Sequence, residues 1–257
     1  MKISTSKIKT YKGCRRLYYF QYIENLECVV KPQAIEEGLN YHDRIDQLYK
    51  NGYFDCDGTD KNIAMAFAYE KYIYPQFKVK KSEEWFECNL SDDVVLVGRF
   101  DGIAEDGCIV EHKTTSSEIN DEYIYNLQWD EQILNYMLVS GKNEMYYTVC
   151  RKPTIRQKQN ETEEEYFSRC VDWYKEDTEK KIRVIKVTRS PKEVLEQQQK
   201  LIYVAKEMEE NEKKDKELAF YRNPSHCTCY GRRCQYASIC LDYKPELEYV
   251  EFKKKEM

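Results

Sequence analysis

The sequence contains no apolar run near the roughly 20 residues that a membrane-spanning helix requires. Its first residues, MKISTSKIKTYKGCRR, also lack the apolar stretch of a signal peptide, so we expect a cytoplasmic chain with reduced thiols and no membrane partner. The phosphate-binding pattern GxxxxGK[ST] is missing, which argues against an ATPase. Histidine is scarce, with only 3 residues, so few positions can contribute an imidazole to a site.

Charge is unevenly distributed along the 257 residues, although the net charge is only −5. The segment 1–23 carries six basic side chains and the segment 222–240 carries three, and neither contains an acid. The rest of the chain is therefore strongly acidic. Aromatic residues are interleaved with the charges of the first segment, which is atypical of a disordered tail and suits a groove for single-stranded nucleic acid.

The 11 cysteines fall into two groups. Four of them, Cys227, Cys229, Cys234 and Cys240, crowd into a short segment, which in a reducing compartment indicates a metal site, with zinc as the first candidate. A single residue separates Cys227 from Cys229, so only one of the two is expected to be a ligand, and Cys14 in the other basic segment is the natural fourth. The remaining cysteines are interpreted as small core residues; they are Cys28, Cys56, Cys88, Cys108, Cys150 and Cys170.

The pattern of apolar residues predicts a mixed sheet with helices packed on it, an α/β (α+β) fold. The expected helices cover 33–50, 60–74, 121–140 and 162–176, and a last long helix begins with the capping box Ser190-Pro191-Lys192-Glu193. The expected strands cover 85–90, 94–101, 108–113, 145–150 and 182–188. Gly141 is expected to end the helix 121–140 as a C-cap.

Charged residues at the ends of two neighbouring strands are the main candidate for chemistry. A hairpin through Asp106-Gly107 would bring Asp101 close to Glu111, and Lys113 would share a strand face with Glu111. Two converging carboxylates suit a hard divalent cation, and an adjacent lysine can orient water beside a phosphate. The hypothesis is phosphodiester hydrolysis by metal-activated water; the alternative is a surface salt bridge between Glu111 and Lys113.

Other polar residues add weight to this hypothesis only in combination. Gln132 and Tyr136 lie four apart, so on a helix they can address one ligand, although an ordinary contact between helix and sheet is the alternative. His42 falls within an early expected helix, where an isolated histidine is more often structural than a ligand. The side chain of His112 is expected to point away from Glu111 and Lys113.

Together these motifs resemble the PD-(D/E)xK nuclease superfamily, in particular its RecB-like branch with a four-cysteine iron–sulfur cluster. That branch includes AddB-type nuclease domains, CRISPR-associated RecB-like exonucleases and phage-encoded relatives. The matching blocks stand in the expected order and are Ser6 to Tyr19 around Cys14-Arg15-Arg16, Glu37-Gly38 to His42, Gly98-Arg99-Phe100-Asp101-Gly102, Glu111-His112-Lys113, Gln132 with Tyr136, and Cys234-x5-Cys240. The resemblance extends from Ser4 to Cys240.

The resemblance implies a role for each motif. His42, Asp101 and Glu111, with the backbone carbonyl of His112, would bind Mg²⁺ or Mn²⁺, and Lys113 would activate or position the attacking water. Gln132 and Tyr136 would contact the DNA strand. Cys14, Cys234 and Cys240 would hold a [4Fe–4S] cluster with one further thiolate, for which Cys227 is favoured over Cys229. Such a cluster would be a structural staple that joins the two basic segments.

The expected protein is therefore a restriction-endonuclease-like single domain over 1–257. Its parts would be a helical N-terminal part (1–80), a catalytic sheet core (81–190) and a C-terminal helix with the iron–sulfur segment (191–245). We expect a DNA nuclease, with a single-strand exonuclease of phage or bacterial recombination and repair favoured. A helicase or strand-annealing partner would be another chain. The alternatives are a catalytically silent DNA-binding or scaffold module and a zinc-binding interaction protein.

Overall fold

The computed structural model describes residues 1–30, 32–229, 232–241 and 251–255, without the side chains of Ala34 and Cys229. The chain divides into two compact units. The sheet unit comprises Gln33–Phe86 and Arg99–Gln197, and the terminal unit comprises Met1–Pro32, Glu87–Gly98 and Gln198–Met257. Two strands and one long helix contribute residues to both units.

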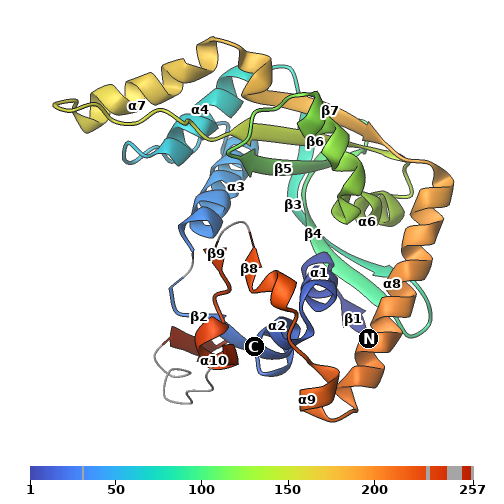
Figure 1. Cartoon of the computed structure of the whole chain (residues 1–257). Helices are drawn as coiled ribbons and strands as arrows, with labels where there is room; N and C mark the ends of the chain where they lie inside the picture. Colours follow the sequence, from blue (N-terminus) through green and yellow to red (C-terminus); the bar gives the residue numbers. More distant parts are fainter. Residues whose placement is uncertain (31, 230–231, 242–250, 256–257) are drawn as a thin grey trace. The chain divides into compact units, whose positions relative to one another are not determined.

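A mixed sheet provides the framework of the sheet unit (Figure 1). Its strands are β3 (Val79–Asn89), β4 (Val95–Ala104), β5 (Ile109–Thr115), β6 (Glu144–Arg151) and β7 (Ile182–Thr188). Strand β5 runs antiparallel to β4 and parallel to β6, and β7 runs antiparallel to β6. The pairing of β4 with β5 is short, since only Gly102 and Ile103 face partners on β5. The predicted mixed sheet flanked by helices is confirmed.

Helices cover both faces of this sheet (Figure 1). The elements involved are α3 (Gln33–Asn51), α4 (Lys61–Tyr72), α5 (Asp121–Asn126), η2 (Leu127–Trp129), α6 (Glu131–Ser140), α7 (Glu163–Asp172), η3 (Trp173–Lys175) and η4 (Thr178–Lys180). Cys150 of β6 packs in a core with α3, α4 and α7, whereas its neighbour Val149 packs in a second core with α5 and α6. Alternate residues of one strand therefore serve opposite faces, as the period of a strand requires.

Several local signals act as the sequence predicts. The predicted helices 33–50 and 60–74 correspond to α3 and α4, and Asp60 caps α4 by accepting hydrogen bonds from two backbone N–H groups. Gly141 ends α6 in the left-handed conformation with φ +67°. The capping box at α8 (Pro191–Glu212) also forms, because Ser190 and Glu193 exchange backbone-to-side-chain hydrogen bonds of 2.8 and 3.2 Å.

Other boundaries differ from the prediction. The single helix expected over 121–140 is broken into α5, η2 and α6, because Asp130 has an extended backbone and its side chain caps α6 through the Gln132 N–H. The helix expected over 162–176 is shorter in the structure. Helix α7 ends at Asp172, and the 3-10 turn η3 follows it. Strand β3 begins at Val79, well before the expected start at Trp85.

The terminal unit brings together segments from both ends of the sequence. Its elements include β1 (Lys2–Ile3), α1 (Thr5–Gly13), α2 (Arg15–Tyr18), the π-helical turn η1 (Tyr19–Ile23), β2 (Leu26–Cys28), α9 (Lys216–Ala219), η5 (Pro224–His226), β8 (Thr228–Cys229), β9 (Arg232–Arg233), α10 (Ala237–Leu241) and β10 (Phe252–Lys254). Strand β10 pairs with β2, β9 with β8, and β1 runs parallel to the first part of β4. Phe20, Tyr236 and Phe252 stack in its core at centroid distances of 5.9 and 4.9 Å.

The two basic segments lie against each other within this unit. The Arg16 N–H donates to the Tyr221 carbonyl at 3.1 Å, and the Asn223 side chain donates to the Gly13 carbonyl at 2.6 Å. These contacts cross about two hundred positions of sequence, so the unit forms only when both ends of the chain come together.

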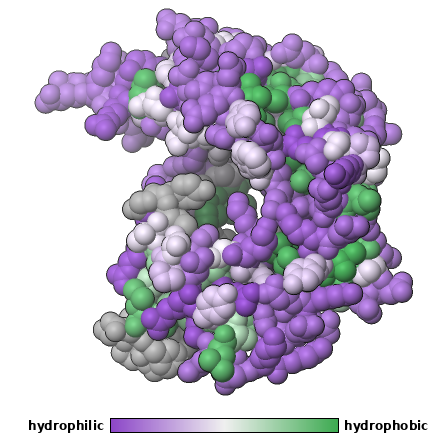
Figure 2. All heavy atoms as spheres, turned by 45° about the vertical axis from the view of Figure 1, so that its right-hand side comes forward, coloured by the Kyte–Doolittle hydropathy of each residue, from purple (hydrophilic) through white to green (hydrophobic). Residues whose placement is uncertain are grey.

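The isolated cysteines are not all core residues. Cys108, Cys150 and Cys170 are buried as predicted. Cys28 and Cys88 are only partly buried, and Cys56 is exposed in the connection between α3 and α4, so the core assignment is wrong for Cys56. Hydrophilic residues cover most of the face shown in Figure 2. No helix within the described ranges is long and apolar enough to span a bilayer.

Candidate functional site

The candidate site lies in the sheet unit, where β4 and β5 part. Gly102 pairs with Val110, and the next residues toward the opening between the strands are Asp101 and Glu111. The His112 backbone N–H is satisfied by the carboxylate of Asp101 at 2.8 Å instead of by a strand partner. The two strands part there, so Asp101 and Glu111 both follow the last pair of the β4–β5 ladder; whether the two carboxylates share one cation stays a prediction.

The two carboxylates belong to opposite faces of the sheet. Phe100 packs in the core with α6, so its neighbour Asp101 faces α3. Glu111 and Lys113, in contrast, contact Gln132 of α6. A cation placed in the opening between β4 and β5 could be approached from both faces.

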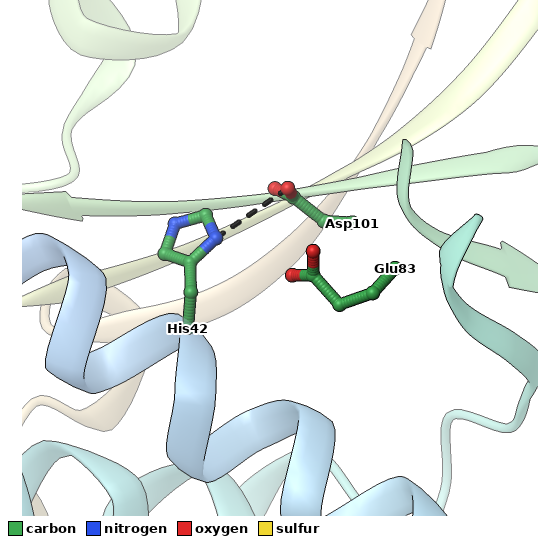
Figure 3. Close-up of side chains that lie close together, drawn as sticks. All are labelled: His42, Glu83 and Asp101. Atoms are coloured by element: carbon green, nitrogen blue, oxygen red, sulfur yellow. Dashed lines mark ion pairs between the residues drawn. The ribbon is translucent and has the colours of Figure 1, made fainter. Parts of the chain in front are cut away.

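Helix α3 contributes His42 to the Asp101 side of the site. Its Nδ1 lies 3.4 Å from Oδ1 of Asp101, and one ligand atom each from His42, Glu83 and Asp101 lie within 4.8 Å of one another (Figure 3). This is the one group of three such donors within the described ranges, and Glu111 lies outside it. Burial would raise the pKa of Asp101, but the hydrogen bond and charge of His42 lower it overall, and the pKa of His42 is raised in return against its own burial.

Glu83 is a functional candidate that the sequence analysis does not identify. It lies within β3 with φ +54°, a left-handed backbone that is rare for a glutamate and interrupts the alternation of the strand. Its carboxylate points into the space that His42 and Asp101 also face (Figure 3). In sequence, Glu83 belongs to the run Lys80-Lys81-Ser82-Glu83-Glu84, which looks like any solvated charged segment, so no signal marks it.

On the α6 side, Glu111 and Lys113 form a compact network with Gln132. The Lys113 ammonium donates to Glu111 Oε1 and, at 3.2 Å, to the Gln132 carbonyl oxygen. The Gln132 amide donates to Glu111 Oε1 at 2.8 Å. Burial, followed by the charge of Asp101, raises the pKa of Glu111, whose side chain is only 2% exposed. Burial opposes the charge on Lys113, but Glu111 more than compensates and raises the pKa of Lys113.

Tyr136 and Gln132 are both turned toward the protein. The Tyr136 hydroxyl accepts a hydrogen bond from Gln132 at 2.8 Å and donates to the Arg99 carbonyl at 3.1 Å. With 5% exposure, Tyr136 is buried against Phe86 and Phe100. In this arrangement the pair orients Glu111 and Lys113, and its contact with DNA stays a prediction.

The side chain of His112 lies on the α3 and α4 face, opposite Glu111 and Lys113, as predicted. Its Nδ1 lies 2.5 Å from the Thr148 hydroxyl, and its ring packs edge-on against Tyr69. Burial lowers the pKa of His112 to about 4, so the imidazole is neutral near pH 7. The imidazole is therefore structural, and the proposed ligand role of the His112 carbonyl is a separate prediction.

The donor set fits a hard divalent cation. Carboxylate oxygens and one imidazole nitrogen are suitable ligands for Mg²⁺ or Mn²⁺. Oε2 of Glu111 is buried and has no hydrogen-bond partner among the described residues, although such an atom normally requires one. A cation in the opening between β4 and β5 would satisfy it.

The terminal unit contains a second candidate centre, a cavity of about 260 Å³ lined by Cys14, Cys227, Cys234 and Cys240. Apolar side chains and two arginines complete its wall; they include Leu17, Phe20, Tyr236, Arg222 and Arg233. A zinc ion bound to four thiolates at ~2.3 Å would hold the sulfurs about 3.8 Å apart. No three of the described thiols lie within 4.8 Å of one another. The side chain of Cys229 lies outside the described residues.

Comparisons with known proteins add little to this geometry. No protein-family model matches the chain, and no curated protein matches it. The fold is similar to a phage-related exonuclease from Haemophilus somnus 129PT, with 12% identity, a TM-score of 0.36 and coverage of 80% of this chain and 92% of that chain. It is also similar to the alkaline exonuclease LHK-Exo from Laribacter hongkongensis, with 10% identity, a TM-score of 0.40 and coverage of 81% and 88%. Similarity at this level does not establish a shared activity.

Proposed function

We propose that the chain is a metal-dependent deoxyribonuclease of the PD-(D/E)xK type. The observation that carries the proposal is that Asp101, Glu111 and Lys113 all lie where the pairing of β4 with β5 ends, with His42 against the aspartate. Gathering such charges in a largely buried place costs free energy, so perturbed groups of this kind are more common at functional sites. A divalent cation and a phosphodiester are the ligands that two carboxylates and an ammonium group can hold together.

In this proposal, His42, Asp101 and Glu111 hold Mg²⁺ or Mn²⁺, and the His112 carbonyl is a further ligand. Such an ion, when bound, supplies a water of lowered pKa and neutralises charge on the phosphate. Lys113 uses two described hydrogen bonds, to Glu111 and Gln132, which leaves one N–H for a non-bridging phosphate oxygen. Because its pKa is raised, Lys113 acts as a charged donor that positions water and phosphate.

The reaction is a hydrolysis in which a water oxygen bonds to phosphorus while one P–O ester bond breaks. The water loses one proton to solvent, and the leaving oxygen of the cleaved strand takes one up. Gln132 and Tyr136 keep Glu111 and the Arg99 backbone in place and are proposed to contact the strand as well. We favour single-stranded DNA and exonuclease action in phage or bacterial recombination and repair. A helicase or strand-annealing protein would be a separate partner.

The direct test is Lys113→Ala with end-labelled single- and double-stranded DNA in Mg²⁺ or Mn²⁺. We expect cleavage to fall by on the order of 10³-fold, because the donor to the phosphate is lost, while the thermal unfolding midpoint stays within a few degrees. Lys186→Ala is the matched control, since Lys186 is a half-exposed lysine of β7 that pairs with Glu144 away from the site. Wild-type cleavage by Lys113→Ala would refute the proposal, and wild-type protein that binds DNA without cleaving it would indicate the silent scaffold.

We further propose a [4Fe–4S] cluster in the cavity of the terminal unit. Cys14, Cys227, Cys234 and Cys240 line one space, and thiolates are the usual ligands of iron–sulfur clusters. A bound cluster would supply a cross-link between chain segments more than two hundred residues apart. Anaerobically purified protein should contain iron and acid-labile sulfide and absorb broadly in the visible range. Colourless protein loaded with zinc would refute the cluster.

The fourth ligand can be assigned by two variants. If Cys227 is the ligand, Cys227→Ser loses iron while Cys229→Ser retains it. The opposite result would move the ligand to Cys229. Wild-type iron content in both variants would mean that neither thiol is needed.

A further inference from the structure

An exposed tryptophan lies beside the candidate metal site. Trp85 of β3 is 74% exposed, which is unusual for the largest aromatic side chain. The Arg99 guanidinium of β4 lies 5.5 Å from the centre of its ring, so the indole is backed by a cation. Trp129 is similarly exposed at 70%, but no lysine or arginine lies over its ring among the described residues.

Arg99 connects this tryptophan to the site. It precedes Asp101 by two residues on β4, so both side chains lie on the same face of the strand. Its Nε lies 2.5 Å from the carboxylate of Glu83, which in turn belongs to the group with His42 and Asp101. The Tyr136 hydroxyl donates a hydrogen bond to the Arg99 backbone carbonyl. The guanidinium is nevertheless half-exposed, with 48% of its side chain accessible to an incoming ligand.

We propose that Trp85 and Arg99 form a platform for one nucleotide of the substrate strand, next to the phosphate that is cut. A nucleobase would stack on the exposed face of the Trp85 indole, and Arg99 would bind the phosphate attached to that nucleotide. Stacking on an aromatic ring and pairing with arginine are the two interactions that hold single strands without reading their sequence. This inference rests on the proposed nuclease function and specifies its substrate.

The platform selects an unpaired strand. In a duplex the faces of a base are covered by its neighbours, so a base must leave the stack before it can reach the indole. A single strand, or a frayed end, presents that face at little cost. We therefore expect the platform to favour single-stranded over blunt double-stranded DNA.

The test compares Trp85→Ala with wild type on two substrates, a single-stranded oligothymidylate and bis(p-nitrophenyl) phosphate. The second substrate has the scissile bond but no base. We expect the ratio of kcat/KM on oligothymidylate to kcat/KM on the small ester to fall about tenfold, through a higher KM. Trp85→Phe should restore most of the ratio, because a phenyl ring still stacks, and Trp129→Ala should keep the wild-type ratio.

Binding provides an independent readout that does not need catalysis. With Ca²⁺ in place of Mg²⁺, the anisotropy of fluorescein-labelled oligothymidylate should give a Kd about tenfold higher for Trp85→Ala than for wild type. For Arg99→Gln, the slope of log K against log salt should shrink by about 0.7, as expected for one lost phosphate contact on a single strand.

The outcomes separate this inference from the proposed function. If Trp85→Ala binds oligothymidylate as wild type does, or if Trp129→Ala loses as much affinity, the platform is refuted whatever the activity. If the wild-type protein cleaves neither substrate but Trp85→Ala binds the oligothymidylate more weakly, the nuclease proposal fails and the platform stands as a single-strand binding surface.

Discussion

The two candidate inorganic centres of this chain are built from opposite chemistry. The sheet unit gathers carboxylates and an imidazole around Asp101, whereas the terminal unit gathers thiols around a cavity at Cys14. Hard oxygen ligands suit a catalytic Mg²⁺ or Mn²⁺ that exchanges its water, and thiolates suit an iron–sulfur cluster that stays in place. The two proposed inorganic groups therefore differ in the ligands that they prefer, and each is matched to one centre.

The centres also differ in how the chain assembles them. Asp101 and Glu111 stand on neighbouring strands joined by a short hairpin, so the local fold brings them together. Cys14 and Cys240 lie at opposite ends of the sequence and meet only when the terminal unit has formed. Loop closure over so many residues costs entropy, so we expect the thiol centre to depend on its metal for stability and the carboxylate centre to depend on it much less.

Cys14→Ser should produce the largest change in stability. Loss of one thiolate would release the proposed cluster, and a ligand that binds only the folded state can contribute on the order of 4 kcal/mol. We expect loss of iron and a much lower unfolding midpoint, measured anaerobically by calorimetry and iron analysis. Cys88→Ser is the matched control, because Cys88 is a partly buried thiol of the same unit that does not line the cavity. Wild-type iron and stability in Cys14→Ser would remove the distinction between the two centres.

Much of the fold could be predicted because the local signals agree with one another. The C-cap at Gly141 and the capping box at Ser190 both appear at the expected places. The break at Asp130 could not be predicted from periodicity, since the apolar pattern continues through it. A short carboxylate side chain that can cap its own backbone competes with the helix at that point.

Candidate residues of the site can be predicted only where sequence spacing controls geometry. Asp101, Glu111, Lys113 and Gln132 were identified because a hairpin and a helix face set their positions. Glu83 was missed, because its position depends on one left-handed backbone conformation inside a strand, which leaves no mark in the residue pattern. The division of Asp101 and Glu111 between two faces was also not predicted, since it requires knowledge of the packing of Phe100.

Glu83→Gln tests whether the carboxylate centre includes this residue. An uncharged amide is a poorer ligand for a hard cation, so we expect the Kd for Mn²⁺, measured by calorimetry or paramagnetic resonance, to rise about tenfold, or ~1.4 kcal/mol. Glu84→Gln is the control, because the neighbouring Glu84 pairs with Lys81 at 2.7 Å and does not belong to the group with His42. Unchanged Mn²⁺ affinity in Glu83→Gln would restrict the centre to His42, Asp101 and Glu111.

The smallest effect concerns Cys150, a thiol that contrasts with those of the cavity. Cys150 is fully buried in the core with α3 and α4, and burial raises its pKa from 9.0 to about 12, although its hydrogen bonds with Tyr174 and Tyr41 act to lower it. The unfolded chain therefore releases this proton at lower pH than the folded chain does. Its stabilisation is complete below pH 9 and is lost as the pH rises from 9 toward 12, by about 1.4 kcal/mol at pH 10.

Denaturant unfolding at pH 8.5 and pH 10 measures this loss, with Cys150→Ala as the comparison. The alanine variant is less stable at both values because it leaves a small cavity, but the fall in its unfolding free energy between them should be about 1 kcal/mol smaller than in wild type. Equal falls would mean that the folded state already accommodates a thiolate at Cys150.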